Sequence, residues 1–153
     1  MDIIRAAVIG AGQIARVSHL PAYRSAEGVQ VVGVSDVRPE SARKLAEDFS
    51  VPAYFDDHRK MLEQCRPDVV SVCVPNRFHH AITLDALRAG AHVLCEKPPA
   101  MNVREAEEMA QTARAQGRLL SYGFHLRHGE NVRILKDIID RGGLGRIYAA
   151  DVQ

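Results

Sequence analysis

The feature that most constrains the fold is a glycine-rich turn in the stretch AAVIGAGQIARVSHLPAY at residues 6–23. Gly10, Gly12 and Ala15 place three small residues between an apolar run that predicts a strand and a segment that predicts a helix. In a dinucleotide-binding turn, the first glycine permits tight bending, the second lets a pyrophosphate approach the backbone, and the third small residue permits close helix packing. Because Gly-x-Gly also occurs in ordinary tight turns, this motif needs support from other parts of the chain.

Short runs of Val, Ile and Leu alternate with segments of helical period along the whole chain. This alternation predicts an α/β fold with a doubly wound, mostly parallel sheet and helices on both faces. We expect a final helix with apolar positions at Val132, Leu135, Ile138 and Ile139, and any domain boundary near residues 123–128. The expected strands cover residues 5–10, 29–36, 51–55, 68–75, 91–98, 118–124 and, as a strand that has only begun, 146–153.

Composition excludes several classes of partner and site. Lys and Arg number 20 against 19 Asp and Glu, so we expect no nucleic acid and no anionic membrane as partner. The three cysteines, Cys65, Cys73 and Cys95, are odd in number and widely spaced, which favours buried thiols in a reducing compartment and no metal site. Since no segment reaches the ~20 apolar residues that span a bilayer, we expect a cytoplasmic protein.

The end of the second expected strand supports a nucleotide site. Gln13 and Ile14 lie in the first helical turn, whose N–H groups and dipole would face the phosphates. Asp36 follows the glycines by a little over twenty residues, where a carboxylate can accept both hydroxyls of the adenosine ribose; the alternative is a residue that caps a turn. A carboxylate repels a 2′-phosphate, so Asp36 favours NAD over NADP. Arg38 leaves NADP possible, because it could hold that phosphate, stack on adenine or remain solvated.

Two longer motifs are more specific than the glycine turn. Residues 74–98 read VPNRFHHAITLDALRAGAHVLCEKP, and YGFHLRH at residues 122–128 precedes GGLGRIYAADV at residues 142–152. With HLPAY at residues 19–23, these motifs resemble the glucose-fructose oxidoreductase, inositol dehydrogenase and rhizopine catabolism (Gfo/Idh/MocA) family of nicotinamide-dependent oxidoreductases. The resemblance covers the whole chain and implies a Rossmann fold that binds NAD or NADP.

The resemblance also implies roles for individual residues. Pro75 and Asn76 would line the dinucleotide beside its nicotinamide half, and His79 would steady that loop, either in contact with the cofactor or as a cap at a helix start. Glu96 would hold the geometry of the strand end. Lys97 would be the catalytic residue, reaching the nicotinamide ribose and the substrate oxygen, where an ammonium can stabilise an alkoxide or relay its proton.

For the rest of the molecule, the resemblance implies a Rossmann domain at residues 1–124 and the incomplete beginning of a substrate and oligomerisation domain at residues 125–153. His125 and Arg127 are the candidates for substrate contact. The family implies hydride transfer between a nicotinamide cofactor and a sugar, cyclitol or related polyol, in a homo-oligomer. The alternative function is a dinucleotide-binding module without turnover. We also expect the strand at residues 146–153 to pair with a sheet of another chain or to be disordered.

Overall fold

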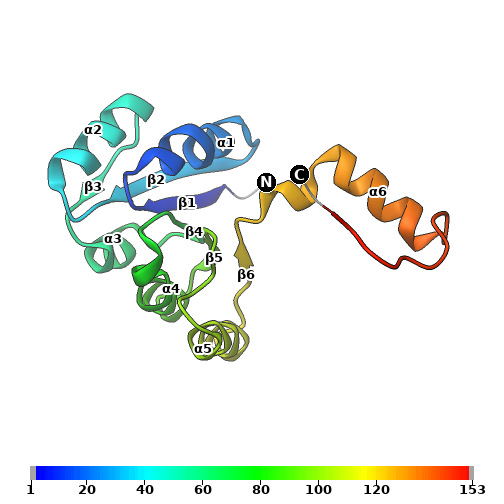
Figure 1. Ribbon diagram of the computed structural model, residues 1–153. Coiled ribbons are helices and arrows are strands. Elements are labelled where there is room, and N and C mark those ends of the chain that lie inside the picture. Colours follow the sequence, from blue (N-terminus) through cyan, green and yellow to red (C-terminus); the bar gives the residue numbers. More distant parts are fainter. Residues whose placement is uncertain (1–2, 152–153) are drawn as a thin grey trace. The chain divides into compact units, whose positions relative to one another are not determined.

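The computed structural model describes residues 3–151, and its part up to Gly123 shows an α/β arrangement with strands at the centre and helices around them (Figure 1). The elements, in chain order, are β1 (Ile4–Ile9), the π-helical η1 (Ala15–His19), α1 (Leu20–Ser25), β2 (Val29–Ser35), α2 (Pro39–Phe49), β3 (Tyr54–Phe55), α3 (His58–Cys65), β4 (Val69–Val72), η2 (Asn76–Phe78), α4 (His79–Arg88), β5 (His92–Cys95), α5 (Val103–Ala115), β6 (Leu120–Tyr122), η3 (His125–His128) and α6 (Glu130–Asp140).

The six strands form one sheet in the order β3-β2-β1-β4-β5-β6, and every neighbouring pair is parallel. This order confirms the doubly wound fold predicted from the alternation of strands and helices. The chain reverses its direction of strand addition between β1 and β4, where Val8 pairs with Ser71 and Ile9 with Val72. In such sheets, ligands bind outside the carboxyl ends of the strands at the reversal point.

Helices cover both faces of the sheet, and each face has its own apolar core. On one face α3, α4 and α5 contribute Met61, Leu87 and Met109, all fully buried. On the other face η1, α1 and α2 pack through Ala15, Leu20 and Leu45. Burial on both faces explains the continuous apolar runs of the central strands.

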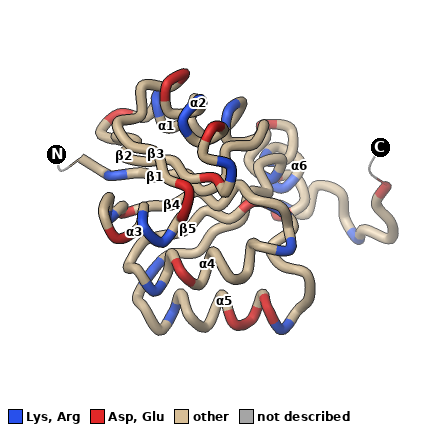
Figure 2. The backbone as a smooth tube through the Cα atoms, turned by 90° about the vertical axis from the view of Figure 1, so that its left-hand side faces the viewer, with Lys and Arg blue, Asp and Glu red and all other residues tan. Residues whose placement is uncertain are grey.

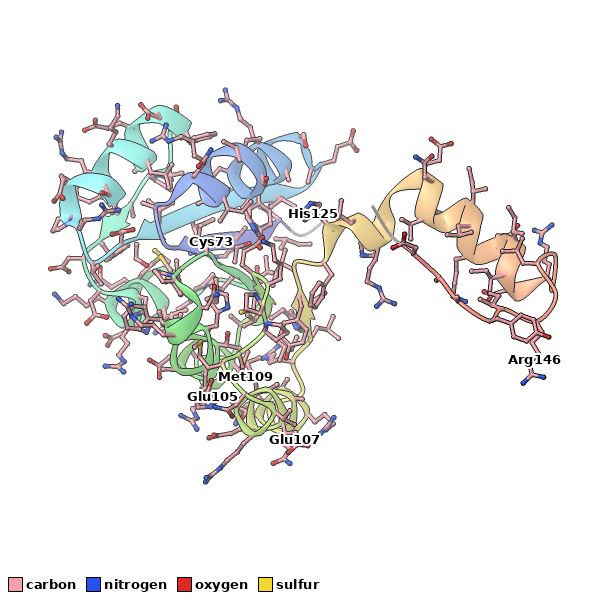
Figure 3. The ribbon with its side chains drawn as sticks, in the orientation of Figure 1. Cys73, Glu105, Glu107, Met109, His125 and Arg146 are labelled. Atoms are coloured by element: carbon pink, nitrogen blue, oxygen red, sulfur yellow. The ribbon has the colours of Figure 1, made fainter. Side chains whose placement is uncertain are left out.

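Two helix ends have capping residues of characteristic chemistry. Asn102 caps α5 by accepting a hydrogen bond from the Glu105 amide (Oδ1–N 3.0 Å), and the Glu105 carboxylate in turn accepts one from the Met101 amide. Gly90 follows α4 with φ +90°, as expected of a glycine just past a helix end. At the start of α5 the Val103 side chain is 73% exposed, whereas Met109 is fully buried and contributes to the apolar contact of this helix. Figure 3 labels Met109 on the side of α5 towards α4.

The chain divides into two compact units, the first ending at Gly123 and the second beginning at Phe124. The second unit contains η3 and α6, and all its described residues are exposed. The predicted strand at residues 146–153 is not formed at residues 146–151, because no other strand offers N–H and C=O partners there; Val152 and Gln153 lie outside the described residues.

Charge is distributed evenly over the described part of the chain. Blue and red segments alternate over α2, α3, α4 and α5 in Figure 2, so neither sign dominates these elements. Within residues 3–151, no helix is long and apolar enough to span a membrane. No group of three His, Cys, Asp or Glu side chains in that range is placed to hold a metal ion.

Candidate functional site

The turn after β1 contains two glycines that differ in their surroundings. Gly10 has φ +99°, and a Cβ atom there would lie 2.4 Å from the carbonyl oxygen of Cys73, so the close approach of the chain just past β1 to the chain just past β4 requires glycine. Cys73 is labelled in Figure 3, just past the carboxyl end of β4. A Cβ atom at Gly12 would meet no atom within 4 Å. Since the fold does not require glycine at position 12, the bare backbone there suits a ligand that lies against it.

Asp36 joins the end of β2 to this turn. Its Oδ2 accepts a hydrogen bond from the Ala11 amide (2.8 Å), and its Oδ1 accepts one from the Arg38 amide (2.9 Å). The Arg38 guanidinium lies 3.5 Å from the same Oδ1, but its side chain is 65% exposed. Each carboxylate oxygen has two lone pairs, so Asp36 retains capacity for ribose hydroxyls after both of these bonds. Gln13 and Ile14 open the helix beside it, where the first N–H groups have no intrahelical partner.

The loop after β4 is fixed by a buried histidine. His79 has no exposed surface; its Nε2 lies 2.8 Å from the Val74 carbonyl oxygen and its Nδ1 lies 2.8 Å from the Pro98 carbonyl oxygen. The ring therefore bridges the loops that follow β4 and β5, and Pro75 and Asn76 are exposed in the first of them. His79 acts through its side chain on two loops rather than as a cap of α4.

Glu96 and Lys97 follow β5 at the same edge of the sheet. The Glu96 side chain is 12% exposed, and its Oε2 accepts a hydrogen bond from the Lys97 amide (3.2 Å). Lys97 is exposed, and the Lys97–Pro98 bond is cis. Among the described residues, no carboxylate forms an ion pair with the Lys97 ammonium.

The three cysteines are free and buried, as the sequence predicts. Burial, together with the nearby Glu96 carboxylate, raises the pKa of Cys73 well above its ordinary value. Burial also raises the pKa of Cys95 to about 11. Thiols of this kind are protonated at neutral pH and are poor nucleophiles, so they belong to the core rather than to the chemistry.

Sequence reasoning missed a polar network beneath the site. His19, at the end of η1, lies 2.9 Å from Ser71 Oγ through Nδ1 and 2.9 Å from Glu96 Oε1 through Nε2. Tyr23 Oη lies 2.7 Å from the same Ser71 Oγ. The only signal was the HLPAY motif, which contains both His19 and Tyr23 but does not reveal that β4 and β5 supply the partners.

The structure brings most of the predicted site residues to one edge of the sheet. The turn at Gly10, the end of β2 at Asp36, the loop at Pro75 and the strand end at Lys97 all follow parallel strands. His125 and Arg127 lie in the second unit, on the short helix η3 (Figure 3 labels His125), and their roles remain predictions. A hollow of about 550 Å³ lies at the opposite edge of the sheet, before β4 and β6, and is lined by residues that include Arg66, Asp68 and Arg118.

A family model described as an oxidoreductase family with an NAD-binding Rossmann fold, GFO_IDH_MocA, matches residues 4–124. D-glucoside 3-dehydrogenase of Escherichia coli (strain K12) is 46% identical over 145 residues, which cover 95% of this chain and 41% of that protein. The chain thus spans about two fifths of the length of this curated relative.

Solved structures share the fold. The WlbA dehydrogenase of Chromobacterium violaceum, in complex with NADH and UDP-GlcNAcA, matches with a TM-score of 0.91 and 27% identity over 97% of this chain and 43% of that chain. KijD10, a 3-ketoreductase from Actinomadura kijaniata in complex with NADP, matches with a TM-score of 0.86 and 33% identity over 95% of this chain and 45% of that chain.

Proposed function

Because the chain belongs to the Gfo/Idh/MocA oxidoreductase family with its NAD-binding Rossmann fold, we propose that it is the cofactor-binding part of an enzyme that transfers hydride between a nicotinamide cofactor and a sugar or polyol. The observation that carries this proposal is the open space at Gly12, beside a helix N-terminus and the Asp36 carboxylate. These are the groups that a pyrophosphate and an adenosine ribose need.

The contacts of the cofactor follow from this placement. The Gly10–Gly12 turn and the amides of Gln13 and Ile14 would hold the pyrophosphate, and Asp36 would accept the ribose hydroxyls. Pro75 and Asn76 would line the nicotinamide half, on the loop that His79 fixes to the Pro98 carbonyl. When bound, the cofactor supplies the hydride acceptor or donor.

The identity of the cofactor depends on Asp36. Its carboxylate is held at the end of β2 by the amides of Ala11 and Arg38, so it cannot easily turn away from a 2′-phosphate. Like charges at short distance disfavour NADP. Arg38 is largely exposed and offers one guanidinium in compensation. We therefore propose NAD as the preferred cofactor.

Lys97 is the proposed catalytic residue. Oxidation of a secondary alcohol requires the hydroxyl to lose a proton as the neighbouring C–H bond loses hydride. An ammonium beside the oxygen stabilises the alkoxide, or an amine accepts the proton. Similarity to D-glucoside 3-dehydrogenase makes the 3-hydroxyl of a D-glucoside the first substrate to test. His125 and Arg127 are proposed to contact that substrate, in an enzyme that we propose to be homo-oligomeric.

A dinucleotide-binding module without turnover is the second candidate, because every residue of the proposed cofactor site lies before Gly123. Both candidates bind a nicotinamide cofactor, and calorimetric titration of the chain with NADH and with NADPH tests this binding. We expect NADH to bind the more tightly. An assay of D-glucosides and cyclitols with NAD then distinguishes the two candidates, since turnover by this chain contradicts a module without turnover.

The variant Lys97→Ala tests the chemical role. We expect it to bind NADH within about threefold of the unaltered chain, less than 1 kcal/mol. Loss of NADH binding in Lys97→Ala would contradict the proposed role, because it would make cofactor binding, and not action on the substrate oxygen, the main contribution of Lys97. Absence of NADH binding to the unaltered chain would contradict the proposed function itself.

A further inference from the structure

His19 is a buried imidazole that the proposed cofactor contacts do not use. It is 8% exposed and lies between the first helix and the ends of two strands. Its Nε2 contacts Glu96 Oε1 and its Nδ1 contacts Ser71 Oγ, both at 2.9 Å. A buried ring with a partner at each nitrogen has one orientation, so it can fix whatever it binds.

With a neutral imidazole at position 19, the hydrogen bonds of this network have one consistent direction. An ionised carboxylate only accepts hydrogen bonds, so Glu96 receives the Nε2–H of His19. A neutral ring then has an acceptor at Nδ1, which receives the hydroxyl hydrogen of Ser71, and Ser71 Oγ receives the hydroxyl hydrogen of Tyr23. Burial raises the pKa of Tyr23, which keeps its phenol protonated as this chain of donors requires.

The Glu96 carboxylate is held on three sides. Oε1 accepts a hydrogen bond from His19 Nε2, and Oε2 accepts one from the Lys97 amide (3.2 Å). Gly123 lies against the third side of the carboxylate. A Cβ atom at Gly123 would lie 2.8 Å from Oε1 and 3.0 Å from Oε2. Thus the carboxylate next to Lys97 in the chain is directed to the backbone and to His19, and no ion pair joins it to the Lys97 ammonium.

The backbone that presents His19 is an unusual one. The Leu20 amide donates to the Ala15 carbonyl, five residues back, which is the hydrogen bond of a π-helical turn. Pro21 follows with no N–H to donate, so the wide turn is not continued into the next residues. π-Helical turns are rare and occur frequently at functional sites.

We propose that His19 is a positioning residue: it keeps Glu96 engaged so that the Lys97 ammonium stays free for the substrate oxygen. Without the His19 donor, the Glu96 carboxylate can turn and pair with the ammonium of Lys97, because opposite charges on adjacent residues of the chain attract each other. The importance of the His19–Glu96 contact for catalysis rests on the proposed role of Lys97.

The test measures the titration of the lysine side chains by NMR. The chain has four lysines, Lys44, Lys60, Lys97 and Lys136, so dimethylation with ¹³C gives few NMR signals, and the variant Lys97→Arg identifies the one of interest. In His19→Leu we expect the Lys97 signal to titrate at a pH higher by roughly half a unit or more, because a nearby carboxylate stabilises the ammonium. The other three signals should not move.

Two variants show whether the titration of Lys97 depends on the N–H donor that residue 19 offers to Glu96. His19→Gln retains an N–H group near the position of Nε2 and should restore the titration of the unaltered chain. His19→Asn is too short to reach Glu96 but can still meet Ser71, so it should behave as His19→Leu does and replaces that variant if it fails to fold. Tyr23→Phe, which leaves the His19–Glu96 bond intact, is the matched control and should leave Lys97 unchanged.

The outcomes separate this inference from the proposed function. A folded His19→Leu or His19→Asn chain with an unshifted Lys97 signal overturns the inference, even if the chain binds NADH. A shifted Lys97 signal upholds the coupling of His19 to Lys97, even if the unaltered chain binds no NADH and the proposed function fails.

Discussion

Gly10 and Gly12 are glycines for different physical reasons. Gly10 has a positive φ and lies against the backbone of Cys73, so the fold itself excludes a side chain there. Gly12 has neither constraint. The sequence motif contains both residues without distinguishing them, and only the packing of β1 against β4 shows which one is left for a ligand.

Gly12→Val therefore separates binding from folding. We expect the free energy of unfolding to change by no more than about 1 kcal/mol, because a Cβ atom at this position meets no neighbour within 4 Å. The affinity for NADH should fall at least about tenfold, since the side chain occupies the place proposed for the pyrophosphate. Urea unfolding and calorimetry measure the two quantities; unchanged NADH affinity would contradict the proposed placement.

His79→Ala is expected to be strongly destabilising. It removes a fully buried ring and its contacts with the carbonyl oxygens of Val74 and Pro98, at least one of which loses its N–H donor, and these effects together cost about 2–5 kcal/mol. His80→Ala is the matched control, because His80 is half-buried and contacts only Glu108 through its ring (3.0 Å), a pair worth about 1 kcal/mol or less. Equal losses in urea unfolding for both variants would show that the two loops do not depend on His79.

At the scale of helices and strands, the contact between α3 and α4 depends on one carboxylate. Asp85 on α4 accepts from His58 Nε2 and Arg59 Nε on α3, both at 2.9 Å. Burial opposes the ionisation of Asp85, but hydrogen bonds from His58 and Arg59 outweigh it and lower the pKa of Asp85. A lowered pKa in the folded state means that the carboxylate stabilises the fold above its ordinary pKa of 3.8 and loses this effect as the pH falls further.

Asp85→Asn should thus destabilise the chain in a pH-dependent way. At pH 7 we expect a loss of about 1–2 kcal/mol in the free energy of unfolding, because two charge-assisted bonds are weakened. The difference from the unaltered chain should shrink once the pH falls below the ordinary pKa of an aspartate. Asp56→Asn, in the exposed pair with Lys60, is the control and should change stability by about 0.5 kcal/mol or less at any pH. Urea unfolding at several pH values measures both.

Elements with strong local signals could be predicted from the sequence, and those that depend on distant partners could not. The strands around Val8 and Val70 have apolar runs that require burial, and Asn102 and Gly90 mark helix ends through their own chemistry. The expected strand from residue 146 is not formed at residues 146–151 of the single chain, because a strand needs a neighbour, and its pairing with another chain stays a prediction. The His19 network was missed for a related reason, since its partners come from β4 and β5, more than fifty residues along the chain.

At the scale of the whole molecule, the two units differ in how they are stabilised. The first unit has a core on each side of its sheet. In the second, the apolar positions predicted for α6 are all exposed, with Leu135 at 50% and Ile138 at 40%. An eleven-residue helix without a packed face is only marginally stable in water.

A chain that ends at Gly123 should therefore retain cofactor binding. Its core and all the proposed cofactor contacts lie in the first unit. We expect NADH affinity within roughly threefold of that of the 153-residue chain, a difference below 1 kcal/mol, and a similar midpoint of thermal unfolding. Calorimetry and circular dichroism give both values, and a shortened chain that folds but does not bind NADH would place part of the nucleotide site beyond Gly123.

The bond between Asp36 and the Ala11 amide has a consequence for anyone who wishes to redirect the chain to a phosphorylated cofactor. The obvious replacement, a small neutral residue at position 36, removes the repulsion but also the side-chain bond to the Ala11 amide, and leaves the backbone bond from the Gly10 amide to the Ser35 carbonyl. Such a redesign would loosen the pyrophosphate contacts shared by both cofactors. Asparagine at that position keeps an oxygen for the Ala11 amide and gives up the charge, which makes it the better starting point for that engineering.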